Sequence, residues 1–110
     1  MKIWRFYSHL ALIYGVTLSI ASIAHANPSL QNGKQIDQEK CVSCHAKKSS
    51  FGSGDMIYTR TDSKVTSFAK LKAMVGMCNS ELRLDLFPED EADVVAYLNH
   101  QFYKFKTNQK

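Results

Sequence analysis

The pentapeptide CVSCH, residues 41–45, is the stretch from which the fold of this chain can be worked out. Its spacing, C-x-x-C-H, is typical of the attachment of a c-type haem. Cys41 and Cys44 would bind the two vinyl groups along one edge of the porphyrin. His45 follows directly, so its imidazole would reach the iron from one side of the ring.

Other sites share part of this spacing. A thioredoxin-like cysteine pair follows a strand within a βαβ unit, and no such pattern precedes Cys41. A zinc site needs a second pair of ligands, for which only Cys78 and His100 remain after the motif. A structural disulfide is the third alternative. We therefore predict one covalently attached haem c, with Cys41 and Cys44 as its attachment points and His45 as a ligand of the iron.

Residues 1–26 have the features of a secretory signal peptide. Lys2 and Arg5 form a basic start, an apolar run follows, and Ala24-His25-Ala26 matches the small-x-small cleavage pattern. A membrane-spanning helix needs about 20 apolar residues, so the run is short for a permanent anchor, although an uncleaved anchor is the alternative. We expect a mature domain of residues 27–110, a periplasmic location and no stable membrane insertion after cleavage.

Composition and charge narrow the class of protein. The chain has 110 residues, of which 22% are charged and 45% hydrophobic, values that exclude a disordered polar chain and a multi-span membrane protein. Loss of Lys2 and Arg5 with the signal peptide lowers the formal net charge from +4 to +2, which argues against a nucleic-acid partner. A set of lysines flanks the motif and forms either a docking face for an acidic partner or an ordinary solvated surface: Lys34, Lys40, Lys47 and Lys48.

Helices are the only elements that the pattern predicts. After a chain break at Asn32-Gly33, a short helix should run from about residue 32 to residue 41, and turn-forming residues predict a loop over residues 46–62. A second helix should cover residues 63–75, because Gly76 is a natural C-terminal stop.

The last helix is predicted over residues 88–105. Pro88 suits a first helical turn, acidic residues follow it, and apolar residues at helical spacing should face the core: Val94, Val95, Leu98 and Phe102. We therefore expect an all-α fold of three to four helices around one haem.

The loop after the motif contains two further points of interest. Arg60 is a possible contact of a haem propionate, because a guanidinium suits a carboxylate; solvation at the surface is the alternative. Residues 46–62 contain no proline. The partner that orients the His45 imidazole is thus not identified by the sequence, although such partners are the rule for ligating histidines.

Three candidates for the other axial ligand stand in a row. Met77 offers a soft thioether that stabilises ferrous iron, whereas a Cys78 thiolate would stabilise ferric iron. Asn79 offers a weak, hard amide oxygen that suits ferric iron and would be released on reduction. Residue chemistry alone ranks Met77 first, since an asparagine in a loop usually has a turn role.

The order of the predicted helices resembles class I cytochrome c, in which the first and last helices cross beside the haem. The Cys78-Asn79 pair followed by FPEDEADVVAYLN, residues 87–99, is similar to the SHP family of small, high-spin, oxygen-binding cytochromes c. The resemblance implies His45 as proximal ligand and Asn79 as distal ligand. It also implies binding of dioxygen or nitric oxide by the reduced protein, and a dihaem cytochrome c as electron donor. In class I cytochromes c the loop after the motif usually contains a proline, which this chain lacks.

Three hypotheses for function follow. The first is a gas-binding haem protein in which Asn79 leaves the iron on reduction, with turnover of dioxygen or nitric oxide left open. The second is a simple electron-transfer cytochrome c with Met77 on the iron. The third, weaker hypothesis is a redox or nitric oxide sensor that uses Cys78.

Overall fold

The structure is a computed structural model that describes residues 26–48 and 53–107. Every regular element in these ranges is helical, which confirms the all-α prediction. Of the predicted signal peptide only Ala26 is among the described residues. Within the described ranges, none of the helices combines the length and apolarity needed to cross a membrane. The elements in chain order are α1 (Leu30–Ile36), η1 (Asp37–Val42), α2 (Ser43–Lys48), η2 (Gly54–Tyr58), α3 (Phe68–Leu82), α4 (Pro88–Leu98) and η3 (Asn99–Tyr103).

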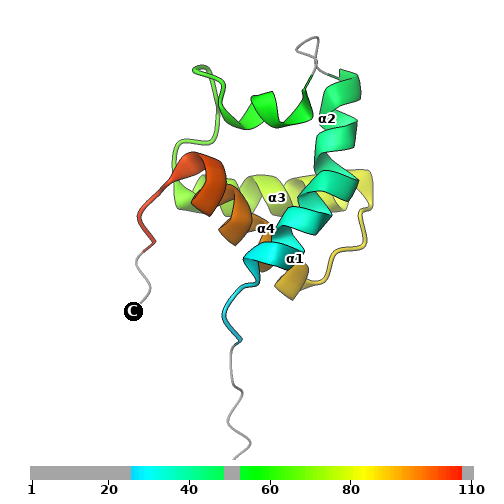
Figure 1. The fold of residues 1–110 in the computed structure, drawn as a ribbon, viewed down its shortest axis with the longest axis vertical. Helices are drawn as coiled ribbons and strands as arrows, with labels where there is room; N and C mark the ends of the chain where they lie inside the picture. Colours follow the sequence, from blue (N-terminus) through cyan, green and yellow to red (C-terminus); the bar gives the residue numbers. More distant parts are fainter. Residues whose placement is uncertain (1–25, 49–52, 108–110) are drawn as a thin grey trace, which may run out of the picture.

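The first three elements form one continuous helical rod (Figure 1). Ser29 caps its start, because its hydroxyl accepts a hydrogen bond from the Asn32 backbone N–H at 3.2 Å. The predicted helix before the motif is confirmed. The prediction of a loop from Ala46 is wrong at its start, because the rod carries the whole CVSCH motif and ends only at Lys48.

The rod crosses α4 at a close contact (Figure 1). The Asn32 side-chain amide donates to the carboxylates of Asp90 at 3.1 Å and Asp93 at 2.8 Å. The backbone N–H of Ser29 donates to Asp93 at 2.7 Å. A Cβ on Gly33 would lie 2.1 Å from the Asp93 backbone oxygen. Gly33 therefore lies inside α1 as the point of closest approach, and the predicted chain break at Asn32-Gly33 is wrong.

The next helix, α3, differs from its prediction at both ends. It begins at Phe68, because the Ser67 hydroxyl accepts a hydrogen bond from the Lys70 backbone N–H at 3.2 Å and caps the first turn. It then continues through Gly76. A glycine inside a helix costs about 1 kcal/mol relative to alanine, a penalty that the packing of α3 on α4 outweighs.

The C-terminal end of α3 is formed by residues beyond Leu82. Arg83 adopts a left-handed conformation with φ 49°. The backbone N–H of Leu84 donates to the Asn79 carbonyl at 3.1 Å, which completes the cap. Met77 and Asn79, predicted in a loop, therefore belong to the last two turns of α3.

The last helix follows its prediction closely. Pro88 occupies the first turn of α4, and the Asp90 carboxylate accepts a hydrogen bond from the Phe87 backbone N–H at 3.2 Å. The helical path continues through η3 to Tyr103, and Lys104, with φ 58°, ends it.

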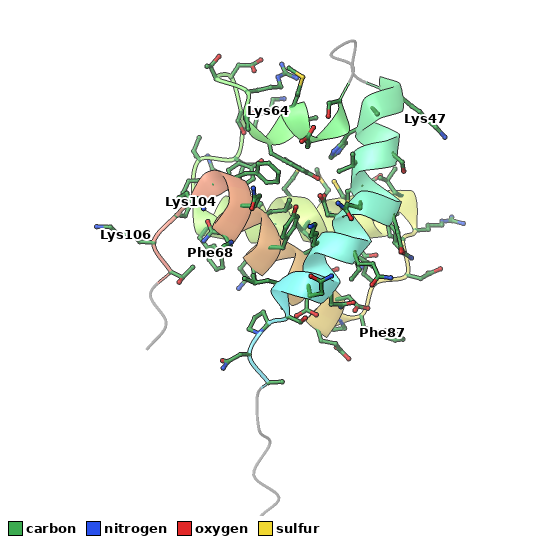
Figure 2. The ribbon with its side chains drawn as sticks, in the orientation of Figure 1. Lys47, Lys64, Phe68, Phe87, Lys104 and Lys106 are labelled. Atoms are coloured by element: carbon green, nitrogen blue, oxygen red, sulfur yellow. The ribbon has the colours of Figure 1, made fainter. Side chains whose placement is uncertain are left out.

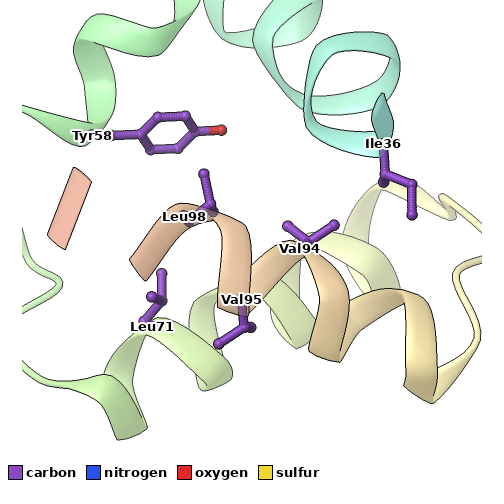
Figure 3. Packing of buried hydrophobic residues seen from close by; sticks show 6 residues of the cluster. All are labelled: Ile36, Tyr58, Leu71, Val94, Val95 and Leu98. Atoms are coloured by element: carbon purple, nitrogen blue, oxygen red, sulfur yellow. The ribbon is translucent and has the colours of Figure 1, made fainter. Parts of the chain in front are cut away.

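The core lies between α1, α3 and α4 and includes one residue of η2 (Figure 3). The predicted core positions Val94, Val95 and Leu98 are buried, which confirms the predicted inner face of the last helix. Phe102 packs against the same cluster at its margin. The buried apolar residues are Ile36, Tyr58, Leu71, Val94, Val95 and Leu98.

The segment predicted as a loop contributes to this core through η2. A Cβ on Gly54 would lie 2.0 Å from the Val42 backbone oxygen, so η2 begins in direct contact with η1. The turn then buries Tyr58, which is 9% exposed. The prediction of a loop over residues 46–62 is wrong here too, because Gly54–Tyr58 form a helical turn; residues 49–52 lie outside the described ranges.

Candidate functional site

The three residues of the predicted attachment motif line one cavity: Cys41, Cys44 and His45. Their positions follow from the helix that carries them, because residues at i, i+3 and i+4 share one helix face. All three are half-buried, and Cys41 and Cys44 carry free thiols. The structure thus brings the two thiols and the imidazole together at one wall of the same space.

The cavity is mostly apolar and has a volume of about 280 Å³. Sites for small molecules and cofactors typically measure roughly 300–1,000 Å³ and are lined mainly by hydrophobic side chains. The cavity therefore lies at the lower end of that range and has the lining typical of such sites. The other walls come from η2 with the segment after it, from α3, from the residues between α3 and α4, and from the inner face of α4.

The environment of Cys41 keeps its thiol neutral. Burial, followed by the nearby Asp37 carboxylate and Cys78, raises the pKa of Cys41 to about 12. A thiol with this pKa is protonated at neutral pH and is a poor nucleophile toward disulfides. The contribution from Cys78 places that residue of α3 near the motif.

The His45 ring is packed at the cavity wall. Its Nδ1 atom is shielded from solvent. The ring of Tyr58 meets it in an edge-on arrangement, with centroids 5.7 Å apart and planes at 75°. The imidazole therefore has an aromatic neighbour that limits its rotation.

Asn79, the predicted distal ligand, is engaged elsewhere. Its amide nitrogen donates to the Leu86 carbonyl at 3.0 Å and to the Glu91 carboxylate at 2.6 Å. Its oxygen accepts from the Leu86 backbone N–H at 3.1 Å. The side chain clamps the segment between α3 and α4, and Asn79 is not among the residues that line the cavity.

A second asparagine makes the same clamp in a different place. The Asn99 amide nitrogen donates to the Phe105 carbonyl at 3.0 Å, and its oxygen accepts from the Phe105 backbone N–H at 2.8 Å. Asn99 is likewise absent from the residues that line this cavity. A structural role alone is thus sufficient to account for the contacts of Asn79 in this structure.

The sulfur residues of α3 divide into two groups. Met77 is 51% exposed and lies outside the cavity. Met74 and Cys78, one helical turn apart, both line it. The sequence places Met74 inside the helix that precedes the ligand candidates, where a packing role is the ordinary interpretation. Because α3 continues through Gly76, Leu71, Met74 and Cys78 share one of its faces.

Arg60 lies at the rim of the cavity. Its guanidinium contacts Asp62 through two hydrogen bonds, at 2.8 and 2.5 Å. This interaction holds the pKa of the exposed Asp62 carboxyl below its usual value. The predicted propionate contact of Arg60 stays a prediction that its position at the rim allows.

The basic residues near the motif are exposed where the structure describes their side chains. Lys47 of α2 extends away from the fold, and Lys64 belongs to the segment after η2 (Figure 2). Lys40 is exposed too, and its ammonium donates to the Leu84 carbonyl at 2.8 Å across the cavity edge. A docking face formed by the lysines stays a prediction.

The residues of the site fit a covalently bound haem. They supply two thiols, an imidazole and a mostly apolar cavity that all three line. Among the described residues, no group of three or more His, Cys, Asp or Glu side chains is arranged to hold a metal ion directly. A haem needs no such group, because its porphyrin nitrogens hold the iron. His100, the one histidine after the motif, is exposed on η3.

In comparisons with known proteins, no family model, curated protein or solved structure matches this chain.

Proposed function

We propose that the chain is a periplasmic monohaem c-type cytochrome with a class I fold. One observation carries the proposal: Cys41, Cys44 and His45 line the same apolar cavity. The crossing of α1 and α4 beside that cavity is the arrangement expected for this class. Cys41 and Cys44 would hold the haem through thioether bonds, and His45 would be the proximal ligand.

The haem would supply an iron that cycles between the ferric and ferrous states and binds dioxygen or nitric oxide when an axial position is open. The chain's contribution is to exclude water through the apolar walls from α3 and α4. It would also hold the His45 imidazole against Tyr58. Arg60 at the rim would contact a propionate, and the lysines beside the motif would guide a dihaem cytochrome c that donates the electron.

We assign the weak distal ligand of the ferric protein to Asn79. Ligation would require its amide oxygen to give up the hydrogen bond from Leu86. A net contribution of about 1 kcal/mol for each hydrogen bond then favours return of Asn79 to Leu86 and Glu91. A hard amide oxygen suits ferric iron better than ferrous iron, so Asn79 would ligate the oxidised protein only and would keep its hydrogen bonds to Leu86 and Glu91 in the reduced protein, which could then bind dioxygen or nitric oxide.

A second candidate function is supported by Met74. This residue lines the cavity, whereas the Met77 of the alternative hypothesis does not. A thioether from Met74 on the iron would give a low-spin electron carrier without a site for gases.

The two candidates can be separated on the purified, secreted protein. Intact mass and the pyridine haemochrome spectrum measure haem attachment. Ferric and ferrous spectra with and without carbon monoxide measure the distal position. Asn79→Ala is compared with Asn99→Ala, which removes the equivalent clamp outside the cavity. Met74→Leu is compared with Met77→Leu, which changes an exposed methionine.

The proposed function predicts a high-spin ferrous protein that binds carbon monoxide at once, and a ferric spectrum altered only by Asn79→Ala. A low-spin ferrous protein that ignores carbon monoxide until Met74 is replaced supports the electron carrier. A secreted, folded chain with no attached haem would overturn both.

A further inference from the structure

Asp37 is a buried carboxylate that the proposed function does not use. It lies in η1, one helical turn before Cys41, and is 2% exposed. Burying a carboxyl group without compensation is costly. Its Oδ1 atom accepts a hydrogen bond from the Tyr58 hydroxyl at 2.5 Å. The two residues form a closed polar pair inside an otherwise apolar core.

Tyr58 connects this pair to the proximal side of the cavity. Figure 3 shows its ring extending from η2 over Leu98, with the hydroxyl directed toward the rod that carries Ile36. The Tyr58 ring and the His45 imidazole are in edge-on contact, with their centroids 5.7 Å apart. Phe102 packs on it at 5.0 Å, and Tyr103 at 6.3 Å. The Tyr58 ring is thus held on several sides, with the Asp37 hydrogen bond at its tip.

Chain connectivity makes the arrangement specific. Asp37 precedes the motif and Tyr58 follows it, so the hydrogen bond closes the chain around CVSCH from both sides. The contact of Gly54 with Val42 brings the start of η2 against the rod and so allows Tyr58 to reach Asp37. Residues that orient a ligating histidine are usually found in its immediate surroundings.

We infer that Tyr58, anchored by its hydrogen bond to Asp37, is the positioning residue that fixes the orientation of the His45 imidazole. This inference rests on the proposed function, because it assumes that His45 binds the haem iron. It gives the buried tyrosine–carboxylate pair a role on the proximal side of the cavity, through the ring contact of Tyr58 with His45. Burial raises the pKa of Asp37 while the Tyr58 hydrogen bond opposes that rise, which accords with a carboxyl group kept for this contact.

The test uses the secreted haem protein and two variants that each remove the hydrogen bond between Tyr58 and Asp37. Tyr58→Phe keeps the ring and deletes the hydroxyl, and Asp37→Ala deletes the acceptor. Asp37→Asn is the conservative rescue, because its amide oxygen still accepts from Tyr58. Tyr97→Phe is the matched control: it deletes the hydroxyl of a tyrosine that packs on Phe102. The readouts are the ferric electron paramagnetic resonance spectrum and the midpoint reduction potential, which report the axial imidazole rather than general stability.

We expect Tyr58→Phe and Asp37→Ala to split or broaden the ferric resonance into more than one species and to shift the midpoint potential. Asp37→Asn and Tyr97→Phe should keep a single wild-type resonance. Full haem attachment with a wild-type resonance and potential in Tyr58→Phe would overturn the inference, even if Asp37→Ala fails to fold. Failure of the proposed function is distinguishable, because the wild-type protein itself would then carry no haem by mass.

Discussion

Gly33 of α1 lies against the backbone carbonyl of Asp93 in α4, so closely that an added Cβ would be 2.1 Å from the Asp93 oxygen. The same Cβ would lie 2.9 Å from the Cβ of Tyr97. Backbone atoms cannot move aside as the end of a flexible side chain can. This contact therefore sets the distance between the two crossing helices, and with it the position of the motif-bearing rod above the cavity.

Gly33→Ala should lower the free energy of unfolding by about 1–3 kcal/mol or more, as overpacking of a close contact does. Gly76→Ala is the matched control. Its Cβ would lie 3.5 Å from a Glu91 carboxylate oxygen, an ordinary contact, and alanine favours the helix interior by up to about 1 kcal/mol. Urea denaturation of both variants should give changes of opposite sign. Equal effects would show that the crossing tolerates a side chain at residue 33.

Asn79→Ala should destabilise the fold by about 1–3 kcal/mol, because it leaves the Leu86 backbone N–H without its acceptor. Asn79→Asp restores that acceptor but loses the two hydrogen bonds that the amide nitrogen donates. It also places a second carboxylate beside Glu91. Urea denaturation at neutral and at acidic pH separates the two variants. The aspartate variant should regain stability relative to alanine as the pH falls, and no such gain would contradict the clamp.

The pH dependence of the free energy of unfolding should reveal the burial of the Asp37 carboxyl group. Burial raises its folded-state pKa above the ordinary value of 3.8, so the folded protein holds the proton more tightly than the unfolded chain. The stability from this group is present below the unfolded pKa and is lost as the pH rises through the folded pKa. Asp37→Asn cannot titrate, so its stability relative to the wild type should improve as the pH rises.

Asp62→Asn is the control for that measurement. The hydrogen bond from Arg60 lowers the pKa of Asp62, so its contribution is present above the unfolded pKa and is lost as the pH falls. The Arg60 and Asp62 side chains are exposed, so the effect on the free energy of unfolding should be small. Urea denaturation across the acidic range should give trends of opposite sign for the two variants. A pH-independent difference for Asp37→Asn would contradict its burial.

Methionine oxidation tests whether Met74 lies in the cavity wall while Met77 is exposed outside it. Met77 and Met56, 51% and 46% exposed, should be oxidised by dilute hydrogen peroxide well before the half-buried Met74 in the cavity wall. Peptide mass spectrometry over time gives the order, because each methionine becomes a sulfoxide. Fast oxidation of Met74 would show that this residue does not line the cavity.

Features that depend on local spacing were predictable. Pro88 with the acidic turn after it, and the apolar spacing of Val94, Val95 and Leu98, predicted the last helix and its inner face, because helix periodicity is written in neighbouring residues. Cys41, Cys44 and His45 were predicted to act together from the spacing of the motif, and the structure adds that one helical rod carries all three. The boundaries of α3 differ from the prediction, since its cap is Ser67 and its C-terminal left-handed residue is Arg83 rather than a glycine.

The sequence by itself determined the helical class, the final helix and the convergence of Cys41, Cys44 and His45, because each depends on residues a few positions apart. Only the tertiary structure decided that Gly33 is a helix-crossing contact, that Asn79 clamps Leu86 and that Tyr58 joins Asp37 to the side of His45. These relationships bring together residues from separate helices and turns. Whether a glycine breaks a helix or admits a neighbour depends on what packs against it, which no local pattern specifies.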